Sequence, residues 1–254
     1  MAGIAVARDR TTLVTGGLLL VVALAAWAVL LAQPAMAMPA MPDPVDAIGF
    51  LVAWGIMMIA MMLPSAVPMI ALYGVVRRNA AKTGQASLRE AVFTLVYVAV
   101  WVAMGVPVYV GSVFIANQPQ LEPVLPYALA AVLVLAGVYQ LTPLKRACLR
   151  VCRNPLSFFM ARSRTGYRGS FELALEHAAY CVGCCWGLML VLVAAGAMAL
   201  NWVLLIAAIV FIEKILPRGE WSAAVAGAAL IALGLAVALR PELAMIIHPG
   251  SMSM

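Results

Sequence analysis

Long apolar stretches are the feature that most constrains the fold of this chain. About seven of them approach the roughly 20 residues that an α-helix needs to cross a hydrocarbon core about 30 Å thick. They cover residues 12–31, 47–75, 91–115, 124–141, 173–198, 202–216 and 221–239. Because 66% of the residues are hydrophobic and 10% are charged, there is too little polar surface to coat a soluble domain of this size. The sequence therefore predicts an all-α, polytopic membrane helix bundle.

The first apolar stretch resembles a secretory signal at its ends. Arg8 and Arg10 precede it, and Ala-Met-Ala follows at 35–37. Its apolar run is longer than the roughly 7 to 15 residues of a signal core. We therefore expect residues 12–31 to be a retained span.

The distribution of basic residues predicts the orientation in the membrane, because cationic segments are poorly translocated. An N-terminus in the cytoplasm leaves Arg240 as the one basic residue outside. It places inside Arg77, Arg78, Lys82, Arg89, Lys145, Arg146, Arg150, Arg153, Arg162, Arg164, Arg168 and Arg218. We expect a multi-pass protein of the bacterial inner membrane with its C-terminus in the periplasm or outside the cell. The net charge of +6 then reflects topology and contact with anionic lipid, and nucleic acid is not an expected partner.

The chain is predicted to form one membrane domain over residues 1–254. Residues 1–46 hold the first span and an outward loop rich in Met and Pro, residues 47–239 form the main bundle, and residues 240–254 form an outward tail with Met and His. The longest inward loop is 142–172.

One predicted span carries a cluster of soft metal ligands. At 100° per residue, His177, Cys181 and Cys184 fall within about 60° of one another on a helix, and Cys185 continues round the same side. Thiolates select Cu(I) most naturally, while a mixed sulfur and imidazole set also suits Zn(II). Buried cysteines can also act as small hydrophobic residues, but a histidine in lipid is costly without a partner. We predict a metal site, with copper favoured over zinc.

A second span offers thioethers at a matching depth. Met57, Met58, Met61 and Met62 form two pairs spaced four apart in 47–75, followed by Pro64. A single helix rarely completes a coordination shell, so these residues are the expected partners of the cysteine face. Methionine is also an ordinary filler of hydrophobic cores, and that interpretation remains open here.

Further residues are candidates for supporting roles. A metal relay is predicted for the thiols and thioethers outside the spans, together with one histidine: Cys148, Cys152, Met36, Met38, Met41 and His248. Basic neighbours are expected to lower the pKa values of Cys148 and Cys152. Support behind the ligands is predicted for Glu176, Glu213 and Lys214.

These motifs resemble an uncharacterised bacterial family of predicted metal-binding integral membrane proteins. The resemblance rests on Met-Met-x-x-Met-Met-x-Pro-Ser at 57–65, on Cys148, on Cys-Arg-Asn-Pro at 152–155, and on His-x3-Cys-x2-Cys-Cys-Trp at 177–186. Glu213 and Lys214 also match. The resemblance covers roughly 47–239 and implies metal binding without implying a reaction.

Three functions fit the sequence. The leading hypothesis is a protein that binds Cu(I) in the membrane and either transports it or delivers it to a membrane or periplasmic cuproenzyme, with exchange to a metal carrier. The second is a membrane thiol-disulfide oxidoreductase, because Cys181 and Cys184 have the spacing of a redox pair. The third is an accessory subunit of a larger membrane complex. A redox pair does not call for His177 or the four methionines of 47–75, whereas a metal site accommodates both, which favours a binder over an enzyme. No nucleotide-binding loop, hydrolase triad or haem attachment motif is present, so an ATP-driven pump is not expected from this chain alone.

Overall fold

A computed structural model describes residues 10–32, 44–78, 83–162, 164, 166–196, 199–216 and 219–247. Every regular element in these ranges is a helix, which confirms the predicted all-α class. The longer helices are α2 (Arg10–Ala32), α3 (Pro44–Arg78), α4 (Thr83–Ala103), α5 (Gly105–Ala116), α6 (Leu125–Leu141), α9 (Gly166–Ala194), α10 (Leu200–Ile215) and α11 (Gly219–Leu239). The shorter ones are η1 (Pro119–Val124), α7 (Pro143–Arg153), α8 (Pro155–Met160) and α12 (Leu243–Ile247).

Six segments in the described ranges are long and apolar enough to cross a membrane, as expected for a multi-pass membrane protein. They are Leu13–Ala32, Asp46–Val75, Ser87–Ala116, Pro119–Leu141, Gly166–Ala194 and Gly219–Leu239, and each coincides with a predicted span. The remaining predicted span corresponds to α10, which has 16 residues. At 1.5 Å per residue, α10 is about 24 Å long, which is shorter than a typical hydrocarbon core.

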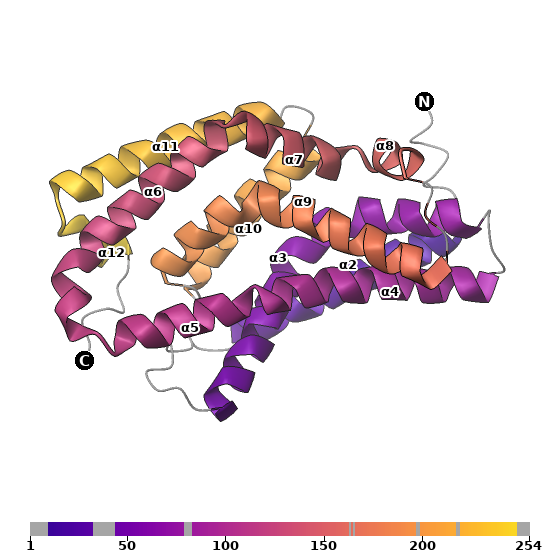
Figure 1. Cartoon of the computed structure of the whole chain (residues 1–254), viewed down its shortest axis with the longest axis horizontal. Coiled ribbons are helices and arrows are strands. Elements are labelled where there is room, and N and C mark those ends of the chain that lie inside the picture. The colour runs from indigo at the N-terminus through magenta and orange to yellow at the C-terminus, as the bar shows by residue number, and fades with distance from the viewer. Residues whose placement is uncertain are drawn as a thin grey trace.

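The helices α3 and α9 form the interior of the bundle. The apolar windows of α3 and α9 are each 56% buried, whereas that of α2 is 17% buried. In Figure 1, α4 and α5 run along one side of α9, and α6 packs along α11 on the other. More of the side chains on α3 and α9 than on α2 are therefore shielded by the other helices.

Small residues allow α6 and α11 to approach closely. A Cβ atom added at Gly227 would lie 2.8 Å from the carbonyl oxygen of Gly137, and one added at Gly234 would lie 2.9 Å from that of Ala130. Helix association in lipid depends on such close packing, because no hydrophobic effect drives it. Glycine at these positions therefore holds the outer pair of helices together.

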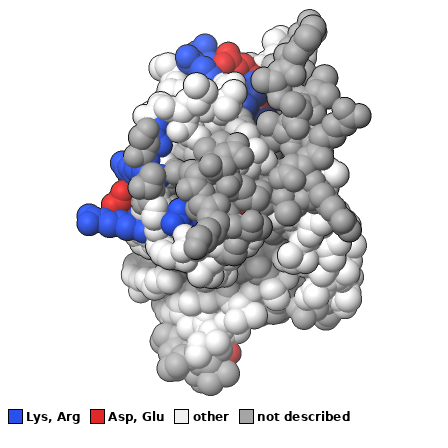
Figure 2. All heavy atoms as spheres, turned by 90° about the vertical axis from the view of Figure 1, so that its right-hand side faces the viewer, with Lys and Arg blue, Asp and Glu red and all other residues white. Residues whose placement is uncertain are grey.

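The end of the bundle at the right of Figure 1 carries charged side chains. Figure 2 looks onto this end and shows lysine and arginine side chains along its upper and left parts, with acidic ones beside them. Arg162 pairs with Glu176 at 2.5 Å, and Arg164 and Arg168 pair with Glu172 at 3.2 and 3.0 Å. Three of the basic residues that the sequence assigned to the cytoplasm are thus paired with carboxylates within the protein.

The segment 142–172 is more than the loop expected from the sequence. Thr142 caps α7 by accepting a hydrogen bond from the backbone N–H of Lys145 at 3.3 Å, and Pro143 occupies the first turn, where a missing N–H costs nothing. The helix α7 packs against α9 and buries Leu149 and Lys145 while exposing Arg146 and Arg150. This packing places two more thiols, Cys148 and Cys152, against the core.

Candidate metal centre

Three cysteines of α9 form the centre of the site. The sulfur atoms of Cys181, Cys184 and Cys185 all lie within 4.8 Å of one another, and each side chain is about 1% exposed. Positions three and four apart share a helix face, which explains why this spacing gathers the thiols. The sulfur atoms of Cys184 and Cys185 are 3.3 Å apart. We call these three residues the cysteine triad.

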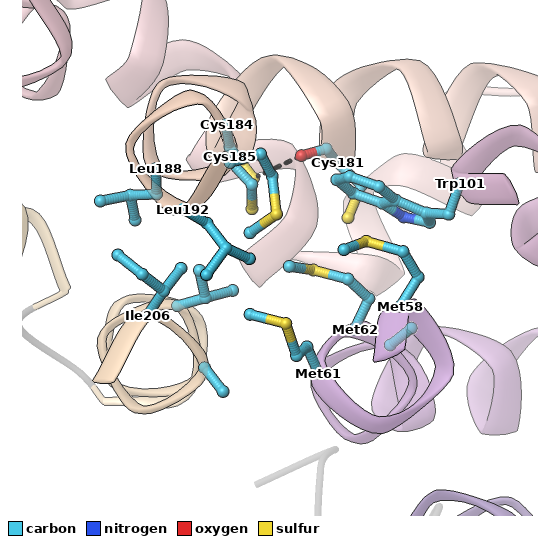
Figure 3. Packing of buried hydrophobic residues seen from close by; sticks show 14 of the residues in the cluster. Met58, Met61, Met62, Trp101, Cys181, Cys184, Cys185, Leu188, Leu192 and Ile206 are labelled. Carbon is cyan, nitrogen blue, oxygen red and sulfur yellow. Dashed lines mark hydrogen bonds between the residues drawn. The ribbon is translucent and has the colours of Figure 1, made fainter. Parts of the chain in front are cut away.

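The methionines of α3 lie opposite the cysteine triad. Figure 3 shows the side chains of Met58, Met61 and Met62 extending from α3 toward the cysteine face of α9. All three are buried, and Met57 is buried in the same core. The helix α3 remains continuous through Pro64 and Pro68, so the prolines do not interrupt this row of thioethers.

A fourth thiol reaches the triad from α7. The sulfur of Cys152 lies 3.8 Å from that of Cys184. A Cβ atom added at Gly183 would lie 3.0 Å from the sulfur of Cys148, so the glycine inside the α9 motif makes room for α7. Spacing in the sequence gave no sign of this approach, since Cys152 and Cys184 are 32 positions apart.

The expectation that basic neighbours lower the pKa values of the α7 thiols is wrong. Burial raises the pKa of Cys148, and hydrogen bonding with Cys181 together with burial raises the pKa of Cys152 well above its ordinary value. Arg146 and Arg150 point away from the thiols into exposed positions. The pKa shifts of both α7 thiols therefore run opposite to the expectation.

Cys181 has an environment that the other thiols lack. Its sulfur lies 3.0 Å from Nζ of Lys214 and 3.1 Å from the hydroxyl of Tyr97. Lys214 comes from α10, is 8% exposed, and also donates to Oγ of Ser65 on α3 at 3.2 Å. One positive charge and one hydroxyl group therefore act on a single sulfur of the triad.

Tyr97 was not predicted as a site residue. It lies on α4 between Phe93 and Trp101, four residues from each, so one face of α4 presents three aromatic side chains to the interior. Its hydroxyl also donates to the carbonyl of Met62 at 3.5 Å, which links α3 to the cysteine face. The i, i+4, i+8 aromatic spacing was the available signal for an inward face.

Glu213 is adjacent to Lys214 in sequence but belongs to a different network. Its carboxylate accepts from Nζ of Lys145 at 2.6 Å and from Nε2 of Gln140 at 2.8 Å. Lys145 and Glu213 are both nearly inaccessible to solvent. This ion pair joins α10 to α7 and α6, and it contacts no sulfur among the interactions of the described residues.

The structure does not bring the imidazole of His177 into the group defined by the triad. The ring lies between aromatic side chains, with centroid distances of 6.0 Å to Phe93, 5.6 Å to Tyr97 and 5.9 Å to Phe158. Its Nδ1 atom is buried without a hydrogen-bond partner among the described residues. His177 lies one helical turn from Cys181.

The other predicted residues are distributed as follows. Glu176 pairs with Arg162 and, at 3.9 Å, with Arg164, so it faces the charged end of the bundle. Met36, Met38, Met41 and His248 lie outside the described residues. Their predicted relay role remains a prediction.

The donor set fits a soft metal ion. It comprises three buried thiols, a fourth within 3.8 Å of one of them, and thioethers from the facing helix. Thiolates and thioethers favour soft ions such as Cu(I), whereas hard cations require oxygen ligands. The helices and this cluster define a multi-pass membrane protein with a buried group of thiols that could hold a metal ion.

Comparison with models of known protein families assigns the chain to a family. The family model described as PpoB2: Copper chaperone matches residues 51–237, which is more than half of the chain. The protein belongs to this copper chaperone family, and a copper-related metal-binding role follows. The matched region contains the cysteine triad, the methionines of α3 and Lys214. No curated protein and no solved structure matches the chain.

Proposed function

We propose that this protein binds Cu(I) inside the membrane and delivers it to a membrane or periplasmic copper protein. The observation that carries the proposal is the cysteine triad, whose three sulfur atoms lie within 4.8 Å of one another in a site shielded from lipid and water. The description of the family supports copper as the cargo.

The proposed ligands are thiolates of the triad, completed by thioethers from Met58, Met61 and Met62. Neutral thioethers need no deprotonation and add no charge to the hydrophobic interior, which suits an ion held in lipid. Cu(I) accepts small numbers of sulfur ligands, so only some of these groups need bind at any one time. The free energy needed to move the ion from one sulfur ligand to the next is then small.

The proposed route of loading passes through α7. Cys152 is close enough to Cys184 to receive an ion from it or to give one to it. Cys148 lies one helical turn before Cys152 on α7, beside Gly183. In a bacterial inner membrane with the N-terminus on the cytoplasmic side, α7 would face the cytosol, where a soluble metal carrier could supply the ion. On the other side of the membrane, the proposed role of Met36, Met38 and Met41 is to pass the ion to the copper protein that accepts it.

Metal analysis of the purified protein tests the proposal. Protein expressed with copper should retain about one Cu(I) per chain, and X-ray absorption at the copper edge should show sulfur ligands only. Replacing Cys181, Cys184 and Cys185 by Ser should abolish retention. Cys148→Ser is the matched control, because it removes a partly buried thiol outside the triad. Copper retention by the triple variant would refute the proposal.

A second candidate is a membrane thiol-disulfide oxidoreductase. The contacts that favour it are the short sulfur distances, 3.3 Å between Cys184 and Cys185 and 3.8 Å between Cys152 and Cys184. All five cysteines are free thiols. Mass spectrometry of thiols trapped in cells separates the two functions, because a redox enzyme would accumulate a disulfide that cycles with substrate. A carrier would show thiols protected by metal.

A further inference from the structure

The buried ammonium of Lys214 is the feature of the site that sulfur chemistry does not explain. A thiol cluster that only binds a soft ion needs no lysine, and burying a cation in a membrane protein is costly. Nζ of Lys214 lies 3.0 Å from the sulfur of Cys181 and 3.2 Å from Oγ of Ser65. The ammonium therefore points into the metal centre.

Lys214 is a different case from the other buried lysine. Lys145 is neutralised by the carboxylate of Glu213 at 2.6 Å, within a pair that joins α7 to α10. No carboxylate lies within 4.0 Å of Nζ of Lys214 among the described residues, so its charge acts on the sulfur atoms. The group that it would balance is the sulfur of Cys181 once that thiol has lost its proton to bind a metal ion.

We propose that Lys214 is a specificity-determining residue that disfavours divalent cations relative to monovalent ones. With the same ligands, a fixed positive charge beside the site repels a divalent ion by one more unit of charge than a monovalent ion. At an effective dielectric constant of about 20, the repulsion between the ammonium and this extra unit of charge about 5 Å away lowers the affinity for a divalent ion, relative to a monovalent one, on the order of a hundredfold. The sulfur donors favour soft ions over hard ones, and Lys214 favours monovalent ions over divalent ones.

This inference rests on the proposed function, and it concerns the ratio of two affinities. Lys214 attracts the thiolates as well as repelling the ion, so its effect on the affinity for Cu(I) combines two opposing contributions. The thiolate contribution is common to both ions and cancels in the ratio. The ratio of Zn(II) to Ag(I) affinity therefore isolates the effect of the ion's charge. Ag(I) is a soft monovalent probe that resembles Cu(I).

The test compares Lys214→Leu, which removes the charge and adds no metal ligand, with wild-type protein in lipid nanodiscs at one pH. Dissociation constants for Cu(I), Ag(I) and Zn(II) are measured by competition with chelators of known affinity. The Zn(II) to Ag(I) affinity ratio should rise at least tenfold in Lys214→Leu and stay within about threefold in Lys214→Arg, which keeps the charge. If Lys214→Leu does not fold, Lys214→Gln carries the same test, since glutamine keeps a donor and lacks the charge.

The matched control is the double variant Lys145→Met with Glu213→Gln. It removes the other buried lysine together with its partner and should leave the ratio within about threefold of wild type. An unchanged ratio in Lys214→Leu, or an equal change in Lys214→Arg, overturns the inference while wild-type protein still binds Cu(I). Wild-type protein that binds no Cu(I) overturns the proposed function instead.

Discussion

The sulfur atoms of Cys152 and Cys184 lie 3.8 Å apart, although one belongs to the amphipathic helix α7 and the other to the buried helix α9. This contact gives the cysteine triad a neighbour on a short helix that is not itself a membrane span. Of the two α7 thiols, Cys152 is the one in contact with a triad sulfur, whereas the sulfur of Cys148 lies beside Gly183. An ion moving from the triad to α7 would therefore reach Cys152 first.

Cys152→Ser should slow metal exchange without abolishing binding. The triad remains intact, so the amount of Cu(I) bound should stay near that of wild type. Removal of copper by a soluble chelator should slow at least tenfold, because the first sulfur along the proposed route is absent. Stopped-flow measurement with a chromophoric Cu(I) chelator gives the rate. Cys148→Ser serves as the control, and an equal slowing in that variant would contradict a specific role for Cys152.

His177→Phe should retain copper. The imidazole lies between Phe93, Tyr97 and Phe158 and outside the group of triad sulfurs, and phenylalanine preserves its ring packing. The Cu(I) affinity should change by less than about threefold, measured by chelator competition. A tenfold or greater loss would show that His177 moves to bind the ion, as the sequence motif suggested.

Gly227→Val should destabilise the protein by about 1 to 3 kcal/mol, in the range of an overpacked interior. A side chain at Gly227 meets the carbonyl oxygen of Gly137 at 2.8 Å, and backbone atoms have little freedom to yield. Thermal unfolding in detergent measures the loss. Gly111→Val is the control, because no atom lies within 4 Å of a Cβ atom added at Gly111. Similar melting temperatures for the two variants would refute the close packing of α6 and α11.

Lys145→Met should destabilise the fold by about 3 to 5 kcal/mol, because it leaves the buried carboxylate of Glu213 without its partner. Adding Glu213→Gln should restore most of this loss, since the remaining amide carries no charge. Denaturant unfolding of both variants provides the measurement. A double variant less stable than the single one would contradict this explanation, because removing the unpaired carboxylate would then recover no stability.

Several parts of the site were predictable from local spacing. The triad follows from the i, i+3, i+4 relation within one helix, and the methionine row of α3 follows from the same rule. Both predictions needed only the helical repeat, which hydropathy and length had already indicated. The role of Cys152 was predicted only as a relay, because nothing local indicated that residues 143–153 fold back against α9.

The sequence alone determined the helical membrane class, the gathering of three thiols on one helix face, and the soft character of the site. These properties depend on composition and on separations of a few residues, which helix geometry converts directly into distances. Only the tertiary structure decided that Lys214 and Tyr97 act on Cys181, that Glu213 pairs with Lys145, and that His177 lies among aromatic rings. Those relationships depend on how the helices pack, and in lipid packing is set by the fit of whole helix surfaces, which separations along the chain do not specify.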